Sequence, residues 1–138
     1  MSEDMGTFRI DVEIENPVRP GATALVSSAL VDTGSELSWF GARILESLGI
    51  ERSAIRKFRQ ADGTVLDRWV GSAFLYVAGV RTADDVVFAE PGDLTLLGAR
   101  SLEGLNLRID PVSKRLIDAG PAPAAVVSRE APREAAMA

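Results

Sequence analysis

The chain has 138 residues, of which 46% are hydrophobic and 25% charged, and its formal net charge is −5. This length predicts one domain with a real hydrophobic core, while the negative charge gives no electrostatic support for binding nucleic acid or a membrane surface. The absence of both cysteine and histidine excludes disulfides, thiolate nucleophiles, Cys- or His-ligated zinc and Ser-His-Asp hydrolysis.

No segment of the sequence contains the run of about 18 apolar residues that a membrane-spanning helix needs. The first five residues, Met-Ser-Glu-Asp-Met, are polar and acidic, which is unlike a secretory signal. A cytoplasmic location is therefore the default expectation.

In chain order, the apolar pattern predicts many short strands and little helix. A helix is expected over residues 41–50, where Ile44, Leu45 and Leu48 share one face and Gly49 follows as a C-cap. Residues 99–103 predict a helical turn. Strands are expected over residues 7–14, 22–31, 55–60, 65–70, 72–77, 80–88, 94–97, 105–109 and 115–117.

This pattern predicts a mainly β fold, as a small barrel or sandwich with one or two short helices. The domain is expected to cover residues 7–118, preceded by an N-terminal arm over 1–6. After residue 118 the composition changes to Ala and Pro with scattered charges, which predicts a disordered tail over 119–138.

The most informative motif is the run Ala-Leu-Val-Asp-Thr-Gly-Ser over residues 29–35. It places Asp32 at the end of an apolar strand, where a carboxylate is rare unless it is paired, hydrogen-bonded or used. Thr33 and Ser35 can hydrogen-bond a carboxylate or the neighbouring backbone, and Gly34 permits a sharp turn. The simpler interpretation is a turn aspartate that caps its own loop.

With Asp32, Thr33, Gly34 and Ser35, the chain resembles the active-site signature of the retropepsin-like aspartic proteases, the single-lobe, retroviral type. Two later features occur in the order that this family shows. The run Leu96, Leu97 and Gly98 resembles the apolar-apolar-Gly element that packs behind the catalytic loop. The hairpin turn formed by Ala61, Asp62, Gly63 and Thr64 falls where the family carries its substrate-covering flap.

The resemblance implies a closed acid-protease barrel and a homodimer, because the chain carries one signature where two-lobed enzymes carry two. Each subunit would supply one Asp32, and the two carboxylates would share one proton because like charges at that range cannot both ionise readily. One would act as general base on a bound water and the other as general acid toward the peptide carbonyl. In this family the threonine side chains of the two signatures join the two active-site loops by hydrogen bonds across the two-fold axis. The resemblance assigns that role to Thr33. The mechanism implies a peptide or protein substrate, no cofactor and no metal.

The chain departs from the retroviral pattern after Gly98, where Arg100 lies one position later than the family's arginine. An ion pair between Arg100 and Glu36 is the expected brace. Trp39 and Phe40 are expected to pack in the core and not to contact the substrate. For Trp69 core packing and a substrate contact are equally expected, because a flap strand offers one face to the substrate cleft.

A second function stays open from the sequence. A non-catalytic member of the same fold would serve as a dimerisation or peptide-binding module, since a β-rich domain can bind an extended peptide without cutting it. A carboxylate-metal hydrolase has no ligand pattern to support it.

Overall fold

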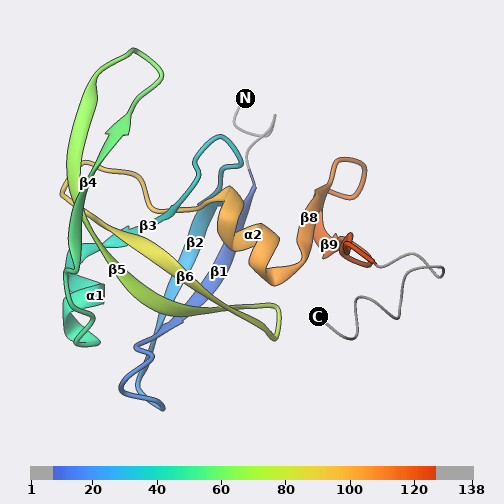
Figure 1. The fold of residues 1–138 in the computed structure, drawn as a ribbon, viewed down its shortest axis with the longest axis horizontal. Coiled ribbons are helices and arrows are strands. Elements are labelled where there is room, and N and C mark those ends of the chain that lie inside the picture. The colour runs from blue at the N-terminus through green and yellow to red at the C-terminus, as the bar shows by residue number, and fades with distance from the viewer. Residues whose placement is uncertain (1–7, 127–138) are drawn as a thin grey trace, which may run out of the picture.

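The structure, a computed structural model, describes residues 8–126 and is mainly β, as predicted (Figure 1). Over that range the chain forms nine strands and two short helices. They are β1 (Arg9–Glu15), β2 (Thr23–Val31), β3 (Ser38–Gly41), α1 (Ala42–Ser47), β4 (Ala54–Arg59), β5 (Val65–Val77), β6 (Val80–Ala89), β7 (Leu96–Leu97), α2 (Ala99–Leu105), β8 (Leu107–Asp110) and β9 (Arg115–Asp118).

Seven strands form one sheet in the order β1-β2-β7-β3-β6-β5-β4. The pairings β2–β7 and β3–β6 are parallel and the others antiparallel. β1 also pairs with β5 across Glu13–Glu15, so the series of pairings that leaves β1 through β2 returns to β1 through β5. β4 lies at the outer end of this order, and β8 and β9 form a separate two-stranded sheet.

The hydrophobic core follows the period-two alternation of the strands. Val12 and Ile14 of β1 and Ala29 of β2 are fully buried, and Leu102 and Leu105 of α2 pack into the same cluster. Burial of each of the larger aliphatic side chains among them, the valine, isoleucine and leucines, contributes about 1.5–3 kcal/mol. The core therefore supports the end of β2, from which the Asp32 loop begins.

The predicted break between strands 65–70 and 72–77 is wrong, because β5 runs unbroken from Val65 to Val77. Gly71, which separates the two predicted strands, lies inside β5 at a close crossing of two chain segments. A Cβ at Gly71 would collide with the backbone carbonyl oxygen of Glu51 and lie 3.0 Å from the Ile50 side chain. Glycine is needed here because another chain segment packs closely against the strand, and it does not interrupt the strand.

Strand β3 was not predicted, since four residues are too few to show a period. The helix expected over 41–50 is confirmed as α1, and Gly49 follows it with a φ of +76°. The Ile50 N–H donates to the Leu45 carbonyl at 3.0 Å, which closes the helix end around that glycine.

The arm over residues 1–6 and the tail from 127 onward lie outside the described residues. Residues 119–126 contain no helix or strand. Neither helix within 8–126 is long and apolar enough to cross a membrane.

Candidate active site

Asp32 lies directly after β2 and is held through its backbone and its side chain. Its N–H donates to the Leu97 carbonyl at 2.9 Å, and its Oδ1 accepts the Gly34 N–H at 2.9 Å. The Ser35 N–H donates to the Asp32 carbonyl at 3.2 Å. The capping interpretation is thus correct as a local statement. The cap occupies only Oδ1 of Asp32. The side chain is half-exposed and also lines a groove.

The other residues of the signature differ in exposure. Thr33 and Gly34 are exposed, at the outer side of the loop. Ser35 is half-buried, and its hydroxyl donates to the Leu37 carbonyl at 2.8 Å. Ser35 therefore closes the loop onto β3, while Thr33 and Gly34 are accessible to another molecule.

The Leu96, Leu97 and Gly98 element lies behind this loop, as the resemblance implies. Leu96 and Leu97 pair in parallel with the last two residues of β2. At Gly98 the chain passes so close to the loop that a Cβ would lie 2.6 Å from the Leu37 carbonyl carbon and 2.8 Å from the Ser35 carbonyl oxygen. The φ of Gly98 is −96°, which any residue can adopt. The glycine is therefore needed for space, not for its backbone conformation.

Two backbone hydrogen bonds join α2 to the same loop. The Ala99 N–H donates to the Ser35 carbonyl at 2.8 Å, and the Arg100 N–H donates to the Glu36 carbonyl at 3.0 Å. The first turn of α2 thereby uses N–H groups that have no partner inside the helix. The loop is fixed mainly by backbone contacts.

A buried polar chain continues from Gly98 away from the groove. The Gly98 N–H donates to the Ser38 hydroxyl at 2.9 Å, the Ser38 and Ser101 hydroxyls lie 2.6 Å apart, and the Ser101 hydroxyl donates to Oδ2 of Asp84 at 2.9 Å. Because Ser101 has one proton and gives it to Asp84, Ser38 must donate to Ser101. Both serines are fully buried and the Asp84 side chain is 4% exposed. All three donors, the Gly98 N–H and the two serine hydroxyls, therefore point toward the Asp84 carboxylate.

The expected ion pair between Arg100 and Glu36 is wrong. The Arg100 side chain lies 3.2 Å from Asp84 and 4.0 Å from Asp85, both on β6. Only the Arg100 backbone contacts Glu36. An arginine one position later on a helix is rotated by about 100° about the helix axis, which directs it to β6.

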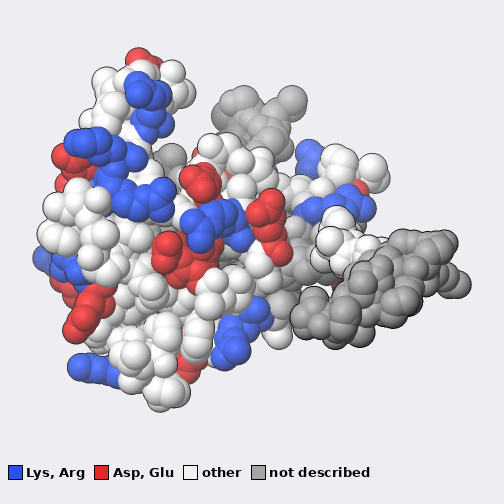
Figure 2. Space-filling view, in the orientation of Figure 1, with Lys and Arg blue, Asp and Glu red and all other residues white. Residues whose placement is uncertain are grey.

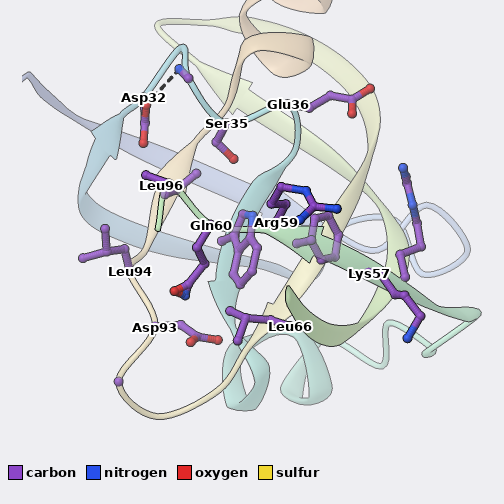
Figure 3. A pocket seen from close by; sticks show the side chains of 16 residues that line it. Asp32, Ser35, Glu36, Lys57, Arg59, Gln60, Leu66, Asp93, Leu94 and Leu96 are labelled. Atoms are coloured by element: carbon purple, nitrogen blue, oxygen red, sulfur yellow. Dashed lines mark hydrogen bonds between the residues drawn. The ribbon is translucent and has the colours of Figure 1, made fainter. Parts of the chain in front are cut away.

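The groove in front of Asp32 has a volume of about 740 Å³ and separates the Asp32 loop from the β4–β5 hairpin (Figure 3). Figure 3 shows Asp32 and Leu96 on one side and Lys57 and Arg59 on the other. The wall opposite the loop comes from β4, from Gln60 and Ala61, and from Leu66. The structure thus brings the two predicted parts of the site, loop and hairpin, to one groove.

The hairpin tip is a tight turn, as predicted. Asp62 Oδ1 accepts the Thr64 hydroxyl at 2.7 Å and the Thr64 N–H at 2.9 Å, and these bonds lower the pKa of Asp62. Gly63 has a φ of +91°. Of the four predicted hairpin residues, Ala61 lines the groove and Asp62, Gly63 and Thr64 form the exposed tip.

The aromatic residues divide between core and groove. Phe40 is fully buried, as predicted. Trp39 is half-buried and lines the groove, with its ring centroid 5.1 Å from that of Phe58 in an edge-to-face contact. Trp69 is 39% exposed and does not line the groove. The contact between Trp39 and Phe58 joins β3 to the base of the hairpin.

An ion pair at the lower rim of the groove was not found from the sequence. Arg68 Nε lies 2.7 Å from Asp93 Oδ2, and Arg68 Nη2 donates to Asp93 Oδ1 at 2.9 Å. Both side chains are 13% exposed. Asp93 Oδ2 also accepts the Glu90 N–H at 2.8 Å. The Arg68 hydrogen bonds lower the pKa of Asp93, and the same contact raises that of Arg68. This pair joins β5 to the loop before β7.

Within residues 8–126 no three acidic side chains gather closely enough to hold a metal ion. The sequence matches no protein-family model and no curated protein. The chemical capacity of the site therefore depends on its own residues. They place one carboxylate on a hydrogen-bonded loop, in a groove of about 740 Å³ that the β4–β5 hairpin lines on the other side.

Proposed function

We propose that the protein is an aspartic endopeptidase of the retropepsin-like type, in which Asp32 of each of two identical subunits activates one water molecule. The observation that carries the proposal is the position of Asp32. It lies in a groove under the β4–β5 hairpin, on a loop that β7, Gly98 and α2 hold from behind.

The strand pairings support the barrel that this class of enzyme requires. They lead from β1 through β2, β7, β3, β6 and β5 and back to β1. We infer that these six strands close into a small barrel, with β4 and the end of β5 extending from it as the flap. Closure would leave β4 as the free strand edge beside the groove.

A second subunit is needed because, among residues 8–126, the groove offers only one suitable carboxylate. Asp93 also lines the groove, but Arg68 and the Glu90 N–H already bind its oxygens. The Glu36 side chain is directed away from Asp32 in Figure 3. An isologous contact through the exposed Thr33 and Gly34 would bring the two Asp32 side chains together across a two-fold axis.

The chemistry then follows from two carboxylates that share one proton. The ionised member removes a proton from the bound water, whose oxygen attacks the peptide carbonyl carbon. The protonated member gives its proton to the carbonyl oxygen. Collapse of the resulting tetrahedral diol breaks the C–N bond as the nitrogen takes up a proton, so no covalent enzyme intermediate forms.

The test compares wild type with Asp32→Asn on an unfolded protein substrate from acidic to neutral pH. Asp11→Asn is the matched control, because Asp11 Oδ1 also accepts a backbone N–H, that of Ser28 at 3.0 Å, and lies away from the groove. We expect cleavage by wild type and Asp11→Asn and loss of cleavage in Asp32→Asn. Equal rates for the Asp32 variant and wild type would refute the proposal.

Oligomeric state provides an independent measurement. Sedimentation equilibrium should show a dimer at micromolar concentration, and activity per chain should fall as dilution dissociates it. A strictly monomeric protein that binds peptides without cutting them would instead be the non-catalytic peptide-binding module.

A further inference from the structure

The wall of the groove opposite Asp32 is formed by the edge of a strand. Six consecutive residues, 56–61, line the groove. Successive side chains of a strand point to opposite faces, so an unbroken run of lining residues means that the groove follows the strand edge. Within the described residues β4 pairs only with β5, which leaves this edge open to an extended chain.

This edge carries positive charge that the rest of the described chain does not neutralise. Arg56 and Arg59 are exposed, and neither forms a salt bridge among residues 8–126. Lys57 differs, since its Nζ lies 3.1 Å from Asp67. Figure 2 shows basic side chains gathered over the β4–β5 hairpin. Arg59 donates one hydrogen bond to the Gly63 carbonyl at 3.3 Å, and the Arg56 guanidinium lies 5.8 Å from the centre of the Phe58 ring. The groove therefore has two guanidinium groups that lack a carboxylate partner among residues 8–126.

We propose that the groove selects peptide segments with acidic side chains, which Arg56 and Arg59 recognise. Guanidinium groups bind carboxylates in a two-point geometry that other cations do not match. That the bound segment is then cut rests on the proposed function. The selection itself is a property of the β4 edge.

The spacing of the two arginines sets the spacing of their partners. A peptide added to the β4 edge places each side chain opposite one residue of β4 and on the same face. Arg56 and Arg59 are three residues apart and on opposite faces. The preferred segment therefore has two Asp or Glu residues three positions apart, one for each face.

The remaining charges favour an acidic peptide over a continuous polyanion. Asp32 and Glu36 line the opposite side of the same groove, and the chain as a whole carries a net charge of −5. A nucleic acid backbone would bring phosphates against those carboxylates along its length. A peptide can present two carboxylates to the arginines and neutral residues to Asp32.

The experiment measures binding separately from cleavage by using the Asp32→Asn protein. The probes are two short rhodamine-labelled peptides of Val, Thr and Ala, one with two Glu residues three positions apart and one with Gln in their place. Fluorescence anisotropy should give about three- to tenfold tighter binding of the Glu peptide. That ratio should shrink as salt is added, since exposed charge pairs are screened.

The variants Arg56→Gln and Arg59→Gln should each reduce the Glu-over-Gln ratio, and the double variant should abolish it. Arg43→Gln is the matched control, because Arg43 is an exposed arginine that does not line the groove, and it should leave the ratio unchanged. A ratio near one in the parent protein, or an unchanged ratio in the double variant, overturns the selection. So does a failure of both peptides to bind at millimolar concentration.

The same peptides with wild-type protein separate the two proposals. A Glu preference in binding without cleavage of either peptide leaves the acidic selection standing and refutes the endopeptidase. Cleavage of both peptides at equal rates and with equal affinities supports the endopeptidase and refutes the acidic selection.

Discussion

Gly98 gives the sharpest prediction, because its substitution acts on the Asp32 loop through a single added methyl group. In Gly98→Ala the new Cβ would lie 2.6 Å from the Leu37 carbonyl carbon and 2.8 Å from the Ser35 carbonyl oxygen, whereas ordinary contacts begin at 3.4 Å. The opposing atoms are backbone, so no rotamer change can relieve the contact. The Leu37 carbonyl oxygen lies closer still, so the loop must move by roughly 1 Å to restore an ordinary contact.

Overpacking of this kind costs about 1–3 kcal/mol, and we expect the upper end of that range because backbone must shift. For a domain of this size the melting temperature should fall by roughly 10 °C. If the protein is the proposed endopeptidase, a displacement approaching 1 Å at Asp32 should lower kcat/KM by about 100-fold.

Gly41→Ala is the matched control. Gly41 has a φ of −52°, and a Cβ there would meet nothing within 4 Å. Its stability should stay within about 0.5–1 kcal/mol of wild type. Urea unfolding of both variants, with the rate of peptide cleavage measured alongside, checks the prediction. A Gly98→Ala protein as stable as Gly41→Ala would refute the close packing argued for the loop.

Three further substitutions test other parts of the structure. Ser101→Ala should lower the free energy of unfolding by about 1–3 kcal/mol in urea titrations, because it leaves the buried Asp84 without its hydroxyl donor. Asp93→Asn should cost about 2 kcal/mol at neutral pH. Since the Arg68 hydrogen bonds lower the folded-state pKa of Asp93, that stabilisation is present above the ordinary pKa of about 4 and disappears as the pH falls through the lowered value. The variant should therefore approach wild-type stability in acid-range melting curves, and a constant difference down to low pH would contradict the assignment. Ala78→Asn should raise stability by about 0.5–1 kcal/mol in thermal melts, because Ala78 has a φ of 51° in the β5–β6 turn, a conformation that asparagine tolerates better.

The parts of the fold that local chemistry decides could be predicted from the sequence. The Asp62–Gly63 turn and the Gly49 helix end depend on residues a few positions apart. Strand β3 could not be predicted, because four residues are too few to show a period. The continuity of β5 could not be predicted either, because Gly71 is required by the close approach of the Glu51 backbone and not by a strand end. A local pattern contains no information about such a crossing.

The site shows the same division. The motif around Asp32 could be found because its residues are adjacent in sequence. The support behind it could not, because Ser38 and Ser101 are 63 residues apart and Ser101 meets Asp84 across another 17. Serine, arginine and aspartate at such separations are common in any soluble domain. Only the fold shows that these three buried side chains join one network.

That network explains how the loop can be rigid without an arginine brace at Glu36. On α2, Arg100 directs its side chain to β6, where it forms an ion pair with Asp84. The loop then depends on the N–H groups of Ala99 and Arg100 and on the N–H of Gly98. Because Gly98 reaches the Asp84 carboxylate only through two hydroxyls, the negative charge of Asp84 polarises the whole chain of donors. The anchoring charge thus lies in the core, and the groove surface beside Asp32 stays free of the bracing arginine.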